Sequence, residues 1–299
     1  MNVLLLSGGK SNEREVSLRS GNSVKEALIA AGHQCKIADP AEPDFDIRNL
    51  VNGIKVVFPV LHGAGGEDGV LQRELEDLGI PFVGSGSEAS ALCFDKWRYK
   101  QFLSKNSLPA SKGRLISRND MGIPEFQKPF VLKPFDGGSS LDTLIIRTID
   151  DQSVSQAAEL LQKYPQMLLE PLTEGSEITV GIFDNEALPI IEIIPPENGD
   201  FDYENKYNGA TQELCPPVNV SIELQKQAQN IALKIHELTG CRHMSRTDIM
   251  IDSNNILHVL ETNTIPGLTD QSLLPKMVRE AGYSMPQFVD RLLILATTK

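Results

Sequence analysis

The segment RTDIMIDSNNILHVLETN combines a guanidinium with oxygen ligands over a short stretch of chain. Its two strand-like runs flank a turn at residues 253–255, which predicts an antiparallel hairpin. The pairing brings Asp248, in the first strand, close to Glu261 and Asn263 in the second, and these two share a face. Such oxygen ligands suit Mg²⁺, and Arg246 adds the cation of a phosphoryl-transfer site. An acidic hairpin edge facing water is the alternative for the carboxylates alone.

A second segment, FVLKPFDGGSSL, has the composition of a phosphate-binding loop. A strand leads to Lys133, and two glycines and two serines follow it. Glycines let the backbone approach phosphate oxygens, amides and hydroxyls donate to them, and lysine adds a positive charge. The segment is not a Walker loop, because no G-x-x-x-x-G-K-[ST] occurs in the chain. The tip of a β-hairpin is the alternative interpretation.

Three further segments carry candidate site residues. GGKSNEREVSL places acids at a helix start, where helix capping is the simpler explanation. LHGAGGEDGVL places His62 in a glycine-rich loop after a strand, which is a better position for a site residue than for a structural histidine. In ETNTIPGLTDQSLLP a Pro-Gly turn precedes Ser272, which opens a helix and can cap it or hold an anionic group.

The elements around these segments fall into three regions. Strands at 3–6, 55–60 and 81–83 alternate with helices at 17–31 and 69–78. This alternation predicts a small parallel sheet with helices on its faces. The next region, with helices at 89–106 and 153–164 and strands at 130–134, 143–146 and 167–170, reads as a small α+β unit. The last region has strands at 178–183, 188–194, 247–251 and 257–261 and helices at 222–238 and 286–295. A long polar loop at 195–215 is expected to be a lid.

The composition excludes several classes of protein. The chain has 299 residues, and 28 basic against 40 acidic residues give a net charge of −12. Length alone favours about two domains. The acidic balance argues against a nucleic-acid binder, and no apolar run approaches the roughly 20 residues of a membrane span. The first residues read as a strand rather than a signal peptide, and four scattered cysteines predict reduced thiols in a cytoplasmic protein.

Taken together, the segments resemble the D-alanine–D-alanine ligases of bacterial cell-wall synthesis. GGKSNEREVSL, LHGAGGEDGVLQ, the Lys133 strand with its Gly-Gly-Ser-Ser, ENKY, RTDIMID and ETNTIPGLTDQSLLP follow that family's order along the whole chain. The resemblance implies an ATP-grasp fold of mixed α/β and α+β class. It implies an N-terminal parallel α/β domain at 1–86, a small central α+β domain at 87–176 and a C-terminal α+β domain at 177–299. It thus implies three domains where length favoured two.

The resemblance also implies the reaction. ATP phosphorylates the carboxylate of one D-alanine, and the amine of a second D-alanine attacks this acyl phosphate. A tetrahedral intermediate then releases phosphate and leaves D-alanyl-D-alanine for peptidoglycan. By the matched motifs, Glu15 orients the ammonium of the first D-alanine in a network with Ser139 and Tyr207. His62 lies near the same subsite.

For the reacting centre, the resemblance assigns Arg246 and the Gly267 amide to the transferred phosphoryl group and the oxyanion. It assigns Ser272 and Leu273 to the carboxylate of the second D-alanine. Burying a phosphoryl group requires neutralisation of its charge, and an acyl phosphate must be kept from water. The loop that carries Lys206 and Tyr207 is the expected lid.

The resemblance implies ATP and two Mg²⁺ ions, with Mn²⁺ as an alternative ion, at the sites given next. The ATP contacts are Lys96, Lys133, Ser140, Glu170, Thr173, Glu177 and Lys206, and the metal ligands are Asp248, Glu261 and Asn263. Besides D-alanine and ATP, the expected partner is a second copy of the chain, because the family is usually dimeric. Neither nucleic acid nor a membrane is expected.

Two positions depart from the family pattern, since Asp142 stands where many members have glycine and Pro171 lies in the adenine hinge. Neither removes a group assigned to the chemistry. The alternatives are a ligase that uses D-lactate or D-serine as second substrate and an inactive nucleotide-binding sensor on the same fold. A nicotinamide dehydrogenase is disfavoured because its glycine fingerprint is missing.

Overall fold

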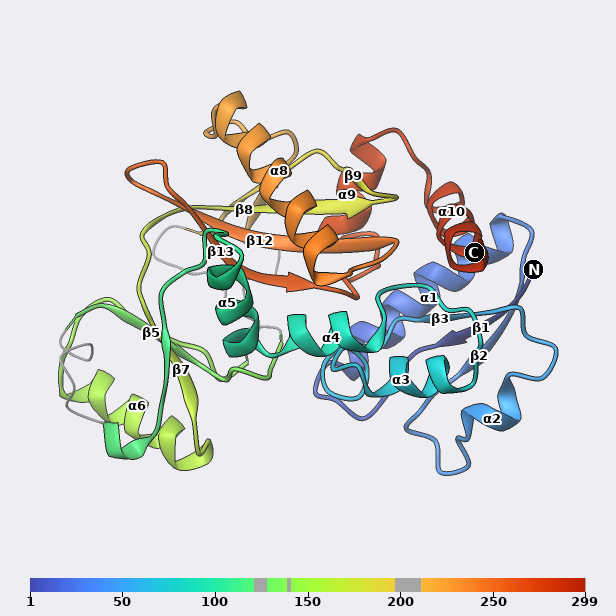
Figure 1. The fold of residues 1–299 in the computed structure, drawn as a ribbon, viewed down its shortest axis with the longest axis horizontal. Helices are drawn as coiled ribbons and strands as arrows, with labels where there is room; N and C mark the ends of the chain where they lie inside the picture. The colour runs from blue at the N-terminus through green and yellow to red at the C-terminus, as the bar shows by residue number, and fades with distance from the viewer. Residues whose placement is uncertain (121–127, 139–140, 197–210, 299) are drawn as a thin grey trace.

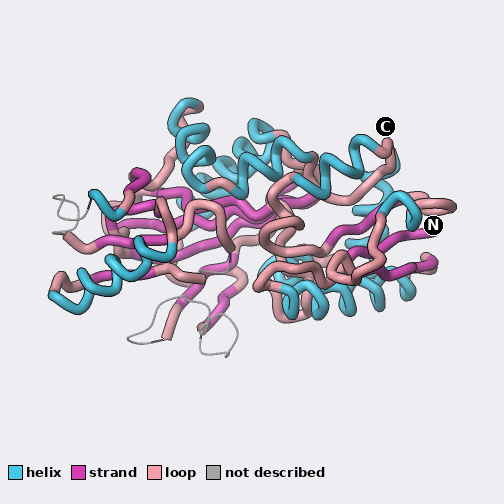
Figure 2. Tube along the Cα trace, turned by 90° about the horizontal axis from the view of Figure 1, so that it is seen from below, coloured by secondary structure: helices cyan, strands magenta, loops and turns pink. Residues whose placement is uncertain are grey.

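The computed structural model describes residues 1–120, 128–138, 141–196 and 211–298. The described strands form three sheets, which lie at the right, the lower left and the centre of Figure 1. Figure 2 shows the same strands from below, with helices along the outer faces. None of the helices within the described residues has the length and apolar character needed to cross a bilayer.

The first sheet is parallel, in the order β2–β1–β3, as the alternation of strands and helices predicts. Its central strand, β1 (Asn2–Leu6), is buried from Val3 onward, and β3 (Val56–Pro59) is buried throughout. The edge strand β2 (Gln34–Ala38) is missing from the sequence prediction, because it is largely exposed and has no apolar run. The accompanying helices are α1 (Arg14–Ala30), α2 (Ile47–Leu50) and α3 (Val70–Asp77).

The second sheet is antiparallel, in the order β4–β7–β5–β6. Its strands are β4 (Arg114–Ile116), β5 (Phe130–Lys133), β6 (Leu144–Ile146) and β7 (Met167–Pro171). The helix α6 (Asp151–Lys163) packs on it and begins with a capping box formed by Asp150 and Ser153. A short 3₁₀ helix covers Arg118–Asp120.

The third sheet has the order β11–β10–β8–β12–β13, with β9 beside β8. Its strands are β8 (Gly175–Phe183), β9 (Glu186–Ala187), β10 (Ile191–Ile194), β11 (Gln212–Leu214), β12 (Met244–Asp252) and β13 (Leu257–Asn263). The helix α8 (Ile222–Thr239) covers one face and shares a core with it. The helices α9 (Leu273–Glu280) and α10 (Met285–Thr297) follow β13 and close another core.

The single helix predicted at 89–106 is wrong, because the structure has two helices there. α4 (Ser87–Phe94) ends before Asp95, and α5 (Lys96–Lys105) begins after it. Asp95 has an extended backbone conformation, and its carboxylate accepts a hydrogen bond from the Arg98 amide at 2.9 Å. It is therefore the N-cap of a new helix, and the break redirects the chain so that Lys96 enters the site described below.

The hydrophobic cores cross the predicted domain boundaries. Tyr99 and Leu103 of α5 are buried against residues of β8 and α8. At the end of the chain, Phe288 of α10 shares a core with Leu28 of α1 and Phe58 of β3. The third sheet and its helices therefore connect the other two sheets, while the boundaries at 86/87 and 176/177 stay predictions.

We expect Phe288→Ala to lower the free energy of unfolding by about 3–5 kcal/mol, because it empties part of a closely packed core. Phe288 is fully buried, and its ring lies 4.8 Å from the ring of Phe183. Urea unfolding followed by circular dichroism measures the change. The matched control on the same helix is Ile294→Ala, because Ile294 is 37% exposed. A loss as small as that of the control would show that α10 does not hold the two regions together.

Candidate active site

The β12–β13 hairpin collects four polar side chains in two register pairs, which the Thr247–Thr262 pair separates. Arg246 pairs with Asn263 across the strands, and Asp248 pairs with Glu261, which confirms the predicted hairpin. Arg246 donates from Nε and Nη2 to the two oxygens of Asp248 at 2.9 and 2.8 Å. Asn263 Nδ2 donates to Asp248 Oδ2 at 3.2 Å. One guanidinium, two carboxylates and an amide therefore lie together.

The charge of Arg246 is maintained by these acids. Burial acts to lower the pKa of Arg246, but Asp248, which accepts two of its hydrogen bonds, and Glu261 raise it above its usual value. The guanidinium is thus a permanent cation inside the protein.

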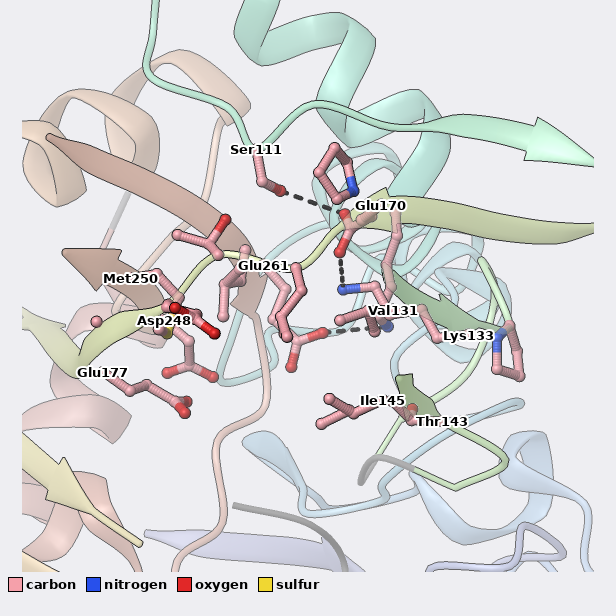
Figure 3. A pocket seen from close by; sticks show the side chains of 18 of the residues that line it. Ser111, Val131, Lys133, Thr143, Ile145, Glu170, Glu177, Asp248, Met250 and Glu261 are labelled. Carbon is pink, nitrogen blue, oxygen red and sulfur yellow. Dashed lines mark hydrogen bonds and ion pairs between the residues drawn. The ribbon is translucent and has the colours of Figure 1, made fainter. Parts of the chain in front are cut away.

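A cavity of about 440 Å³ lies between the second and the third sheet (Figure 3). Seven of the residues predicted for ATP and metal line it: Lys96, Lys133, Glu170, Thr173, Glu177, Asp248 and Glu261. Pro171 lines it as well, at the end of β7. A smaller pocket adjoins this cavity, since Lys96, Gly137, Gly138 and Glu261 line both.

One end of the cavity is built by the start of α5 and the loop after β5. Lys96 Nζ lies 3.1 Å from Glu261 Oε2 and also donates to the Gly137 carbonyl. The backbone amide of Lys96 donates to the Phe135 carbonyl at 2.7 Å. The helix start and the glycine-containing loop are therefore held together where the hairpin carboxylates face the cavity.

The other end contains a buried carboxylate between two lysines. Glu170 of β7 is 4% exposed, and its Oε2 lies 2.7 Å from Lys133 Nζ of β5. Its Oε1 pairs with Lys100 of α5. Burial acts to raise the pKa of Glu170, but the two ammonium groups lower it to about 2. Lys100 was not singled out in the sequence, because nothing near it signals a partner on a distant strand.

The segment before α1 brings Glu13, rather than the predicted Glu15, to the site. Glu15 is exposed in the first turn of α1, whereas Glu13 is 8% exposed. A Cβ added to Gly138 would lie 2.7 Å from Glu13 Oε2, and one added to Gly63 would lie 2.9 Å from it. The Glu13 carboxylate therefore lies against both glycine loops. The periodicity of apolar residues in the sequence could not show which of these two acids faces the site, because Glu13 and Glu15 flank Arg14, the first residue of α1.

The loop after β3 adds a second acid and a buried histidine. Glu67 Oε2 accepts a hydrogen bond from the Gly63 amide at 2.8 Å. Burial, followed by the nearby Glu13, raises the pKa of Glu67 to about 8. His62 is 6% exposed, and burial lowers its pKa to about 4, so the ring is neutral at pH 7. Its Nε2 lies 3.4 Å from Ser20 Oγ of α1.

The turn before α9 places Gly267 against Ser272. A Cβ added to Gly267 would lie 2.8 Å from Ser272 Oγ, so a larger residue there would displace the Ser272 hydroxyl. Ser272 precedes α9 as the sequence predicts, but its hydroxyl contacts Thr269 Oγ1 at 2.8 Å and does not cap the helix. Leu273, the first residue of α9, is buried.

Asp248, Glu261 and Asn263 offer hard oxygen donors. In the described part of the chain no three His, Cys, Asp or Glu residues gather as a metal site. The predicted set has only two carboxylates and completes its donors with an amide. Because Mg²⁺ takes one or two carboxylates together with phosphate oxygens and water, this donor set fits it.

Four predicted residues, Ser139, Ser140, Lys206 and Tyr207, lie outside the described residues. Asp142, just after the first two, has a left-handed backbone with φ of 53°. Glycine adopts that conformation without strain, and aspartate is among the residues that tolerate it. Asp142 Oδ2 lies 2.6 Å from Lys163 Nζ at the end of α6, an additional tie that a glycine would not provide.

Family models and full-length relatives of this chain all point to the same protein family. The family models "D-ala D-ala ligase N-terminus" and "D-ala D-ala ligase C-terminus" match residues 33–85 and 112–294. The D-alanine–D-alanine ligase of Maridesulfovibrio salexigens is 36% identical over 305 residues, which cover 100% of this chain and 99% of that protein. The chain belongs to the D-alanine–D-alanine ligase family.

Solved structures confirm the fold of this family member. The Bacillus anthracis D-alanine–D-alanine ligase complexed with ATP aligns with a TM-score of 0.84 at 28% identity, over 99% of this chain and 97% of that one. The VanG D-Ala:D-Ser ligase of Enterococcus faecalis aligns with a TM-score of 0.81 at 26% identity, over 99% of both chains. The predicted ATP-grasp architecture of the family is thereby confirmed.

The depressed pKa of His62 predicts a pH dependence of stability. The pKa of His62 is 6.5 in the unfolded chain and about 4 in the folded protein, so between these values the unfolded chain binds more protons. Stability therefore falls as the pH drops through this range, by about 2 kcal/mol from His62 at pH 5. His62→Gln should remove that part of the loss, as measured by urea unfolding at pH 7 and pH 5. Equal losses in both proteins would contradict the assignment, since the other histidines are common to both.

Proposed function

We propose that this protein joins two molecules of D-alanine at the expense of ATP, forming the dipeptide for the bacterial cell wall. One observation carries the proposal: a chain that matches this family along its length gathers Arg246, Asp248, Glu261 and Asn263 beside the cavity. The Bacillus anthracis relative was solved with ATP, which supports ATP as a substrate here.

The nucleotide would lie along the cavity, with its base at Glu170 and its phosphates at Lys96. Adenine presents an amino donor and a ring-nitrogen acceptor on one edge. The Glu170 carboxylate and the Lys133 ammonium supply the complementary acceptor and donor, 2.7 Å apart. At the other end Lys96 and the Gly137–Gly138 backbone support phosphate binding. Ser140 and Lys206, outside the described residues, stay assigned to the nucleotide by family resemblance.

Asp248, Glu261 and Asn263 would hold Mg²⁺, or Mn²⁺ in its place. When bound, the metal neutralises phosphate charge and orients the transferred group. Arg246 stays protonated beside these ligands, so it supplies a fixed positive charge for the phosphoryl group and the oxyanion. The Gly267 amide is assigned to the same oxyanion.

The first D-alanine would bind where Glu13 and Glu67 meet. Burial and the neighbouring Glu13 raise the pKa of Glu67, and a substrate ammonium beside the two carboxylates would interact favourably with their negative charge. His62 stays neutral and orients nearby groups without competing for that charge. Ser139 and Tyr207 stay predicted members of this network.

The second D-alanine would place its carboxylate at Ser272 and Leu273, at the start of α9, where helix amides favour an anion. Its amine then attacks the acyl phosphate beside Arg246, and phosphate leaves with the bond electrons. A homodimer in the cytoplasm completes the proposal, and four free cysteines support a reducing compartment.

Phosphate release from ATP tests the function. We expect release with D-alanine and not with L-alanine, loss of release on chelation with EDTA, and recovery with Mg²⁺ or Mn²⁺. Mass spectrometry of the product should show D-alanyl-D-alanine. Release only with D-alanine plus D-lactate or D-serine would change the second substrate. No phosphate release with any substrate pair, while ATP still binds, would favour an inactive nucleotide-binding sensor.

Two neighbouring acids provide a matched test of the first subsite. We expect Glu13→Gln to lower kcat/KM for D-alanine at least about a hundredfold, because one buried charge-assisted contact to the ammonium is lost. Glu15→Gln should change it by less than about twofold, because the Glu15 side chain is exposed. Steady-state kinetics at saturating ATP measures both variants. The reverse order of effects would return the role to Glu15.

A further inference from the structure

We propose that Lys100 is a positioning residue for nucleotide recognition, which with Ser111 holds one oxygen of Glu170 so that the other faces the cavity beside Lys133. This inference rests on the proposed function, because it assumes that the adenine base of ATP binds to the Glu170 carboxylate. It gives a role to a buried lysine that lies behind the cavity wall rather than in it.

The location of Lys100 sets it apart from the other lysines. Its side chain is 4% exposed, and it comes from α5, whose core is shared with the third sheet. Ser111, Glu170 and Lys133 line the cavity, whereas Lys100 is not among the lining residues (Figure 3). Lys100 therefore acts on a ligand only through Glu170 and Ser111, the two lining residues that it contacts.

The contacts divide the two oxygens of Glu170 between different partners. Oε1 pairs with Lys100 and accepts from Ser111 Oγ at 3.2 Å. Lys100 in turn donates to the Ser111 carbonyl at 3.0 Å and to the Ser111 hydroxyl. Oε2 has Lys133 Nζ at 2.7 Å. Because each carboxylate oxygen accepts about two hydrogen bonds, Oε2 retains capacity for a donor from a ligand.

The buried ion pair of Lys100 with Glu170 contributes little net free energy to the stability of the fold. Burying a lysine costs free energy that its partner offsets only with good geometry, so such pairs are weak evidence for stability. Their better-supported use is to specify one arrangement. The terminal torsion of a glutamate is soft. Without Lys100, Glu170 would be held by Ser111 on Oε1 and by Lys133 on Oε2, and its direction would be less closely fixed.

The fixed direction has a consequence for the base. A carboxylate acceptor beside an ammonium donor matches the amino group and ring nitrogen of adenine. A base with a keto oxygen in place of the amino group, as in ITP, would turn an acceptor toward the Glu170 anion. Lys100 thus contributes to the preference for ATP over ITP through the orientation of Glu170.

The test compares Lys100→Met with Lys105→Met, since Lys105 is exposed at the end of the same helix. We expect Lys100→Met to raise KM for ATP about tenfold with kcat nearly unchanged, and KM for ITP much less. The ATP-to-ITP ratio of kcat/KM should therefore fall about tenfold, while Lys105→Met keeps the wild-type ratio. A purely structural role would weaken both nucleotides equally.

Calorimetric binding of ATP and of ITP without D-alanine separates this inference from the proposed function. If the wild type makes no dipeptide but Lys100→Met still loses its preference for ATP, only the proposed reaction fails. If folded Lys100→Met binds ATP and ITP with the wild-type ratio, the inference is overturned. Should that variant not fold, Ser111→Ala is expected to shift the ratio in the same direction by about threefold, and an unchanged ratio there would overturn it too.

Discussion

The antiparallel pairing of β12 with β13 is the constraint on which the rest of the site depends. Side chains alternate along a strand, so a slip of one residue would turn Glu261 and Asn263 away from Asp248. A short turn joins the two strands, and a register shift between Asp248 and Ile249 leaves Asp248 opposite Glu261. On its other side β12 pairs with β8 along its whole length, which anchors β12 in the sheet. The register of the candidate site residues therefore depends on this turn and on the shift in the pairing.

The buried charges around the cavity occur as pairs. Arg246 lies beside Asp248, Lys96 beside Glu261, and Lys133 beside Glu170. Burying such charges without partners would cost a large free energy of desolvation. Each cation that would meet a phosphate or a base is thus kept in place by an acid, and the acids that pair with Arg246 and Lys96 are those assigned to the metal.

The sequence predicts the parts of this site that depend on local pattern. The hairpin, the parallel first sheet and the helix after Ser272 follow from alternation, apolar runs and caps within a few residues. β2 and the break at Asp95 escape prediction because an exposed edge strand has no period and a single cap within a helical run resembles a helix interior. The choice between Glu13 and Glu15 depends on how α1 meets the loop after β3, and the Lys100–Glu170 pair depends on how α5 meets β7. Neither is encoded in the spacing of nearby residues.

The packing of α10 on α1 and β3 has a consequence for how the protein is made. During synthesis the first sheet leaves the ribosome early, but one side of its apolar core is supplied by residues at the far end of the chain. That surface of the nascent N-terminal region stays uncovered until α10 has been synthesised. Contacts of such long sequence separation slow folding and lengthen exposure to aggregation. A chain that stops short of α10 would present this surface permanently, which makes it a natural target for chaperones and proteases.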